Sequence, residues 1–149
     1  MIYLATDHAG FNIAKKIFKF LKAASFSVND LGPKTLDPSD DYPDYGIRLG
    51  QKVAQNKASF GILVCRSGAG MSIVANKVEG IRAVVCLNLL QAKKARDHND
   101  ANVLVLAADF TSFEKMKPII KTFLETKFSG ESRHVRRLEK IKKFERRNL

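Results

Sequence analysis

Five short apolar segments recur along the chain and predict β-strands. They span Ile2–Thr6, Phe26–Asp30, Phe60–Cys65, Ile81–Cys86 and Asn102–Ala107. The third and fourth segments, FGILVC and IRAVVC, are almost uninterrupted by polar residues. Strands that helices cover on both faces show such continuous runs, whereas half-exposed strands alternate. The pattern therefore predicts a buried parallel sheet.

Helical periodicity fills the intervals between and after these segments. It covers Phe11–Ala24, Tyr45–Asn56, Ser72–Val78, Leu89–Asp97 and Ser112–Lys127. Apolar residues in the first of these recur at every third or fourth position, which is typical of a helix packed on a core. The alternation of strands and helices predicts a three-layer α/β/α sandwich of Rossmann-like type, with a five-stranded parallel sheet.

A sixth helix is predicted at about residues 132–146, after the break at Ser129-Gly130. It carries an apolar stripe of Val135, Leu138, Ile141 and Phe144. Neither a linker nor a repeat divides residues 1–149, so we expect one domain extended by this helix. Residues 31–44 contain three prolines and a glycine, which predict a long ordered loop.

The composition is that of a globular protein, with 45% hydrophobic and 28% charged residues. Apolar runs stay well short of the roughly 18 residues of a membrane helix. Asp7 and His8 stand where a secretory signal would be apolar. With two cysteines and no such signal, we expect reduced thiols and a cytoplasmic location.

The net charge of +11 is unevenly distributed. Residues 1–112 contain 14 Lys and Arg against 10 Asp and Glu, whereas residues 113–149 contain 12 against 5. A basic end of this kind is typical of an anion-binding or nucleic-acid-binding surface, and also of a solvated helix face. A nucleic-acid-binding protein is therefore the alternative from outside the enzymes, although the basic end lacks interleaved aromatic residues and any known motif.

Candidate chemistry gathers in short loops beside the predicted strands. Ligands of open parallel sheets bind beyond the carboxyl ends of strands. Residues 7–10 follow the first strand, residues 65–70 follow the third, and residues 97–100 precede the fifth. These loops contain two of the three histidines and one of the two cysteines, so we interpret them as the candidate site.

The turn Ser67-Gly68-Ala69-Gly70 predicts a nest of backbone N–H groups that binds an anion, with a tight turn of small residues as the alternative. It does not fit the known phosphate fingerprints. Cys65 precedes this turn at a predicted helix start, so we expect its pKa to be lowered and its thiolate to act as nucleophile or general base.

The alternative for Cys65 is a small buried hydrophobe, which is our interpretation of Cys86. A Cys–His hydrolase would need His8 or His98 bonded to Cys65. No C-x-x-C or paired-histidine motif occurs, so we do not expect zinc. On the last predicted helix, Arg133 and Arg137 share one face and suit phosphate, whereas His134 is expected to point elsewhere.

Four segments together resemble a known family. They are DHAGF at 7–11, CRSGAGMSIVANKVEGIRAVVC at 65–86, ARDHNDANVL at 95–104 and RHVRR at 133–137. In order and spacing they are similar to ribose-5-phosphate isomerase of type B, whose family also includes allose-6-phosphate and galactose-6-phosphate isomerases. The resemblance implies an aldose–ketose isomerase that interconverts ribose 5-phosphate and ribulose 5-phosphate through an enediolate, with no metal or other cofactor.

Other functions remain open at this point. A six-carbon sugar phosphate is the alternative substrate within the family. A non-catalytic sensor of sugar phosphates is a further alternative. The resemblance also implies a homodimer or a dimer of dimers, with the active site at the subunit interface.

The resemblance implies a role for each matching residue. Cys65 matches the base, and His98 matches the acid that opens the sugar ring. The enediolate is expected to lie against the loop formed by Ser67, Gly68, Ala69 and Gly70. The remaining matches are residues that contact sugar or phosphate: Asp7, His8, Asn99, Arg133 and Arg137.

Two positions depart from the family's pattern. Arg66 stands where glycine is common, and we count it among the substrate-binding residues because its cation would lie near the substrate. If position 66 requires a positive φ, the arginine costs about 1–2 kcal/mol. Asp109 stands where an arginine commonly assists phosphate binding. This predicts weaker phosphate affinity at that corner, or compensation by Arg136 or Lys140.

Overall fold

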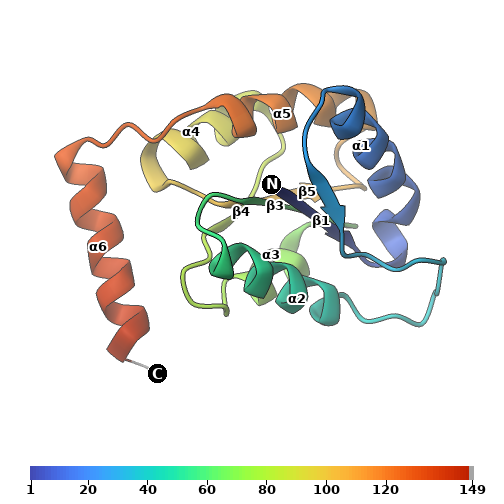
Figure 1. Ribbon diagram of the computed structural model, residues 1–149, viewed down its shortest axis with the longest axis horizontal. Helices are drawn as coiled ribbons and strands as arrows, with labels where there is room; N and C mark the ends of the chain where they lie inside the picture. The colour runs from blue at the N-terminus through green and yellow to red at the C-terminus, as the bar shows by residue number, and fades with distance from the viewer. Residues whose placement is uncertain (148–149) are drawn as a thin grey trace.

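Five parallel strands form the centre of the molecule, in the order β2-β1-β3-β5-β4 (Figure 1). The structure is a computed structural model and describes residues 1–147. The strands are β1 (Ile2–Thr6), β2 (Val28–Asp30), β3 (Phe60–Cys65), β4 (Ala83–Val85) and β5 (Val103–Ala107). This arrangement confirms the predicted parallel α/β sheet.

Helices cover both faces of the sheet. They are α1 (Phe11–Ala23), α2 (Tyr42–Gln55), α3 (Ala69–Ala75), α4 (Leu89–Asn99), α5 (Phe113–Glu125) and α6 (Ser132–Arg147), with a 3₁₀ turn at His8–Gly10. In Figure 1, α1, α4 and α5 lie above the sheet, and α2 and α3 lie below it. The two cores follow this division, one around Phe123 and Leu104, the other around Leu49 and Leu63.

The observed elements differ from the predicted ones mainly at their ends. The two edge strands, β2 and β4, are shorter than their apolar segments suggest. At β2 the cause is local, because Ser25 turns with a φ of 63° and the N–H of Phe26 still bonds to the carbonyl of Leu21 in α1. Helix α2 begins three residues early, at Tyr42, because Pro43 fits a first helical turn.

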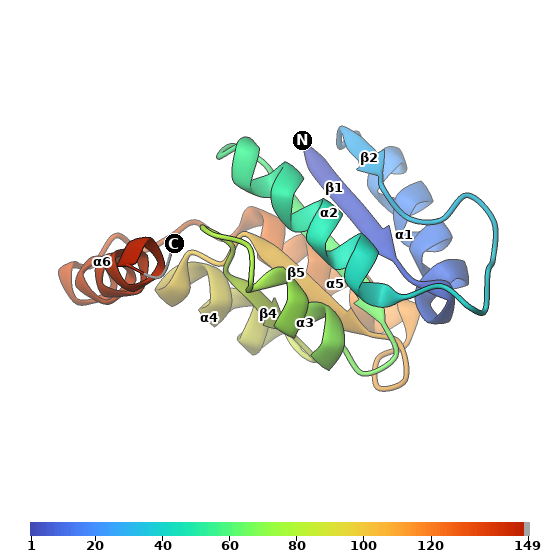
Figure 2. The ribbon, with the colours of Figure 1, turned by 90° about the horizontal axis from the view of Figure 1, so that it is seen from below.

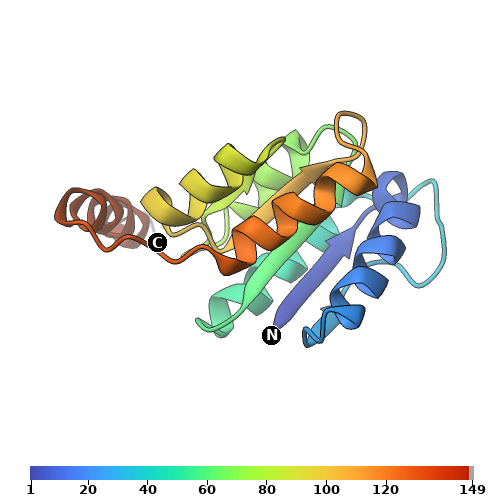
Figure 3. The same ribbon diagram turned by 90° about the horizontal axis from the view of Figure 1, so that it is seen from above.

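Helix α6 stands apart from the three layers, at the end of the molecule opposite the loop 31–41 (Figures 2 and 3). It confirms the predicted C-terminal helix. Its apolar stripe is exposed, with Val135 42%, Ile141 49% and Phe144 69% accessible. No helix among residues 1–147 is long and apolar enough to cross a membrane.

Candidate active site

The strand order places a crevice between β1 and β3. The chain leaves β1 toward β2 on one side, and it leaves β3 toward β4 on the other. Ligands of open α/β sheets bind at such a reversal, beyond the carboxyl ends of the two strands. Thr6 of β1 pairs in register with Val64 of β3. Asp7 and Cys65, the residues that follow, therefore begin the two walls of the crevice.

The loop after β1 is held by its own short side chains. Asp7 is buried, and its Oδ1 accepts hydrogen bonds from the N–H groups of Ala9 and Gly10 at 3.2 and 3.4 Å. The Thr6 hydroxyl donates to the Val64 carbonyl at 3.0 Å and ties β1 to β3. A side chain at position 10 would overlap Thr6 and Val64, so only glycine fits there. These contacts fix where His8 leaves the sheet.

The Cys65 sulfur lies beneath the loop that follows β3. The residue is 6% exposed, and its Sγ accepts a hydrogen bond from the Gly68 N–H at 3.2 Å. Gly68 has a φ of +80°, which turns its N–H back toward the sulfur. The Ala69 N–H bonds to the Ser67 hydroxyl at 3.3 Å. The loop thus supplies polar groups around a buried thiol.

The expected lowering of the Cys65 pKa is wrong for this structure. Burial raises the pKa of the thiol, the backbone N–H groups of Met71, Gly68 and Ser67 oppose that rise, and the charge of Asp7 adds to it. The N–H groups at the start of α3 thus offset only part of the effect of burial. The thiol therefore holds its proton at neutral pH until something changes its surroundings. Burial alone raises the pKa of Cys86, to about 12, as expected of an inert thiol.

Arg66 and Asp109, the two departures from the family's pattern, contact each other. Arg66 Nε donates to Asp109 Oδ2 at 3.2 Å, and the Asp109 N–H donates to the Arg66 carbonyl at 2.9 Å. Among residues 1–147, the non-glycine residues with positive φ are Ser25 and Asp100, so Arg66 carries no such strain. The Arg66 side chain is 73% exposed beside the mouth of the Cys65 loop.

His8 contacts a residue that sequence reasoning missed. Its Nδ1 lies 2.6 Å from Oδ1 of Asp40, and its backbone N–H donates to the same oxygen at 3.0 Å. The Asp40 hydrogen bond is the main cause that raises the pKa of His8. Among the described residues neither His8 nor His98 is bonded to Cys65, so within one chain a Cys–His dyad is not formed.

A second group of predicted site residues lies at the opposite end of the strands, the amino end. Cys65 pairs with Ala107, the last residue of β5, whereas His98 and Asn99 precede the start of β5 at Val103. In a parallel sheet this separates the two groups by the length of a strand, about 13 Å or more. Within one chain, residues 97–100 therefore do not join the other two candidate loops, because a loop before a parallel strand lies at its amino end.

This second group joins α4 to α6. The rings of His98 and His134 lie 4.4 Å apart, and the Ser129 N–H donates to the Asp97 carbonyl at 3.0 Å. His134 is 3% exposed and its Nδ1 lies 2.9 Å from the Ser129 hydroxyl, so it points away from the exposed face of Arg133 and Arg137, as expected. Burial first, then the charge of His98, lowers the pKa of His134.

The exposed arginines of α6 complete this second group. Arg133 is paired with Glu131 at 2.9 Å, and Arg137 lies one turn further along the helix. The group thus combines a histidine pair with two guanidinium groups, which suits a phosphate. Within residues 1–147 no set of three or more His, Cys, Asp or Glu side chains is placed to hold a metal ion.

The fold is an open α/β sheet. One site, at the reversal of strand order, contains the buried Cys65 thiol and the polar loop above it. The other group includes the arginines of α6. Comparison with known proteins gives the family. Residues 2–141 match the family model described as Ribose/Galactose Isomerase. The chain belongs to this family, which confirms the resemblance found in its four motifs.

Individual relatives agree along nearly the whole chain. A Mycoplasma pneumoniae protein named probable ribose-5-phosphate isomerase B is 43% identical over 145 residues, covering 97% of this chain and 95% of the relative. Ribose-5-phosphate isomerase B of Escherichia coli is 37% identical, covering 98% and 97%. A crystal structure of ribose-5-phosphate isomerase B from Mycoplasma genitalium with bound ribulose-5-phosphate superposes with a TM-score of 0.94, at 40% identity, covering 97% of this chain and 95% of that one.

Proposed function

We propose that this protein interconverts ribose 5-phosphate and ribulose 5-phosphate. The observation that carries the proposal is the buried Cys65 thiol under the turn of Gly68, at the β1–β3 reversal of a chain that belongs to the ribose/galactose isomerase family. The relative with bound ribulose-5-phosphate supports the same substrate class. An aldose–ketose isomerisation moves hydrogen within one molecule, so it requires a base, a support for an oxyanion and a hold on the distant phosphate.

Cys65 serves as the base of this reaction. The thiolate removes the proton from C2 of the ring-opened aldose, and the electron pair of that C–H bond forms the C1–C2 double bond of an enediolate, with the negative charge at O1. The Ser67 hydroxyl and the N–H groups of residues 68–70 support that charge, in the manner of an oxyanion hole. Return of the proton to C1, with transfer of the hydroxyl proton from O2 to O1, yields the ketose.

The second group of residues supplies the phosphate-binding side chains and the acid that opens the sugar ring. His98 opens the furanose, Asn99 binds the sugar, and Arg133 and Arg137 hold the phosphate. Within one chain this group lies at the amino end of the strands, whereas Cys65 lies at their carboxyl end. A complete site therefore requires a second copy of the chain. We therefore propose a homodimer, or a dimer of dimers, with two shared active sites.

Exposed apolar surface supports such an assembly. The stripe of α6 is one patch, and a groove of about 860 Å³ runs between α6 and the ends of α2 and β3. A second patch lies beside α3 and the edge strand β4, formed by Ile73, Leu87, Leu89 and Leu90, all between 43% and 65% exposed. Apolar patches of this kind are typical of surfaces that another chain covers.

The proposal is tested by adding ribose 5-phosphate to the purified protein in the presence of a chelator and measuring ribulose 5-phosphate. We expect turnover by the wild type and none by Cys65→Ala, with the variant still folded and still able to bind substrate. Turnover unchanged in Cys65→Ala would overturn the base. A wild type that is inactive on ribose 5-phosphate but converts allose or galactose 6-phosphate would instead establish the six-carbon alternative.

A further inference from the structure

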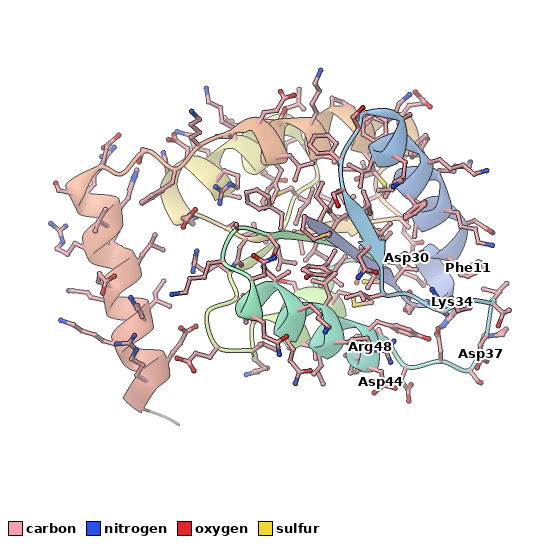
Figure 4. The ribbon with its side chains drawn as sticks, in the orientation of Figure 1. Phe11, Asp30, Lys34, Asp37, Asp44 and Arg48 are labelled. Carbon is pink, nitrogen blue, oxygen red and sulfur yellow. The ribbon has the colours of Figure 1, made fainter. Side chains whose placement is uncertain are left out.

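We propose that Asp40, from the loop before α2, is a positioning residue that keeps the His8 ring charged and leaves Nε2–H as its donor to an anionic oxygen of the substrate. The inference rests on the proposed function and deepens it. It assigns a role to a loop residue that none of the motifs contains. Figure 4 labels Lys34 and Asp37 on the same loop, at the end of the molecule where α1 begins with Phe11.

The geometry of the pair is that of a charge-assisted contact. Asp40 Oδ1 receives both the backbone N–H of His8 at 3.0 Å and the ring at Nδ1, 2.6 Å away. The Asp40 side chain is only 7% exposed, and among the described residues its Oδ2 has no hydrogen-bond partner. A carboxylate so buried requires a cation beside it, and the imidazolium of His8 meets that requirement.

Burial opposes the Asp40 hydrogen bond and is the second-largest influence on the pKa of His8, whereas the nearby charges of Asp7 and Asp40 raise that pKa. Asp7, which caps the turn that contains His8, adds a second negative charge beside the ring. Hydrogen bonds from Ser39 are the main cause that lowers the pKa of Asp37, and the charge of His8 is the smallest cause. Asp37 therefore interacts only weakly with His8. Burial first, and then the nearby Asp40, raises the pKa of the Tyr45 hydroxyl of α2, so Tyr45 stays neutral beside the pair.

The role of Asp40 follows from the two ring nitrogens. With Nδ1–H directed at Asp40, Nε2 is a donor when the ring is charged and an acceptor when it is neutral. The His8 side chain is 37% exposed just after the end of β1, which pairs with β3, so Nε2 is accessible to a ligand at that end of the two strands. A phosphate or an oxyanion requires the donor, and the raised pKa keeps His8 in that form to a higher pH than an ordinary histidine.

The test compares the wild type with Asp40→Asn. The asparagine oxygen still accepts from both N–H groups of His8, so the variant removes the charge and keeps the geometry. The chain has three histidines, which makes the His8 ring signal assignable by NMR. We expect its titration midpoint to move to lower pH in Asp40→Asn. Asp37→Asn is the matched control, because it removes the same charge from the same loop and should leave the midpoint in place.

Kinetics then separate a role in binding from a structural one. If only charged His8 binds substrate, the ratio of KM between Asp40→Asn and wild type stays near one at about pH 5.5. It rises with pH to a plateau equal to the ratio of the two His8 acid constants measured by NMR, while kcat is little changed. Loss of a hydrogen bond to a charged group predicts a plateau of about tenfold.

Three results would overturn the inference: an unmoved His8 midpoint, a KM ratio independent of pH, or the same effect in Asp37→Asn. The titration needs no substrate, so it remains informative if the wild type fails to convert ribose 5-phosphate. In that event the proposed function falls, and the same pH series is run with inorganic phosphate binding in place of KM. Equal phosphate affinity in wild type and Asp40→Asn at every pH would overturn the role of Asp40.

Discussion

Replacing Gly68 by alanine tests the link between the backbone of the loop and the chemistry of Cys65. Gly68 has a φ of +80°, and a Cβ built there lies 3.0 and 3.2 Å from the two methyl groups of Val85. The left-handed backbone costs an alanine about 1–2 kcal/mol. Crowding against a packed side chain adds about 1–3 kcal/mol. We therefore expect Gly68→Ala to lower the free energy of unfolding by about 2–5 kcal/mol.

Gly80 provides the matched control for the backbone cost. Its φ is +78°, almost that of Gly68, but an added Cβ meets nothing within 4 Å. Gly80→Ala should therefore cost only about 1–2 kcal/mol. The gain from restricting the unfolded chain is the same for both variants and cancels in the comparison. The difference between them isolates the contact with Val85.

Urea denaturation followed by circular dichroism measures both variants, at one fixed protein concentration because oligomer stability depends on it. Turnover gives the second readout. The Gly68 N–H donates to Cys65 Sγ at 3.2 Å, so displacement of the loop should lower kcat by about one to two orders of magnitude. Gly80→Ala should leave kcat unchanged. A Gly68→Ala protein as stable and as active as Gly80→Ala would refute this reasoning.

Three further predictions concern separate contacts. Because burial raises the pKa of Cys65, the thiolate fraction and with it kcat should rise with pH above neutrality; a kcat that falls from pH 7 to 9 would contradict this. Asp109→Arg removes the carboxylate that pairs with Arg66 and adds a cation, so KM for the sugar phosphate should fall; an unchanged KM would contradict the weaker phosphate affinity assigned to Asp109. Arg96 is 8% exposed and donates to Asp100 at 2.7 Å, while Asp100 also keeps Arg82 as a partner, so Arg96→Met should lower the free energy of unfolding in urea by about 1.5–3 kcal/mol; a loss under 1 kcal/mol would show that the pair matters little.

The fold was predictable because its buried strands and its helices each leave a distinct pattern of apolar residues in the sequence. The third and fifth apolar segments marked β3 and β5, and the helical stripe beginning at Phe11 marked α1, close to their observed bounds. Prediction failed at the edges, where β2 and β4 keep only three residues each. The apolar content of a segment indicates how deeply the segment is buried. Its hydrogen bonds to a neighbouring strand, however, decide where an edge strand ends.

The site was only partly predictable, for different reasons at different residues. The loops at Asp7 and Cys65 follow from strand ends, which a sequence pattern locates. Asp40 pairs with His8 across 32 positions, and no spacing rule reports such a contact. The lowered pKa expected for Cys65 assumed a helix start in water, whereas the thiol is buried. The position of His98 follows from sequence order, because a loop that precedes a parallel strand lies at its amino end.

The separation of Cys65 from His98 leads to the last prediction, which concerns how the active sites are shared. One variant carries Cys65→Ala, and the other carries His98→Asn together with Arg137→Ala. Each alone should be inactive. In a mixed dimer one site would contain both defects and the other neither, because each site takes Cys65 from one chain and His98 from its partner.

Random pairing of equal amounts makes half the dimers mixed, so activity should recover to roughly one quarter of wild type. Differently tagged chains, coexpressed or refolded together, allow the mixed dimer to be isolated and assayed alone. A site built within one chain would give the opposite result, since both sites of the mixed dimer would then be damaged and no ratio of the chains would restore turnover. Full activity of the His98 and Arg137 variant on its own would also contradict the shared site, because the second group would then have no part in the reaction.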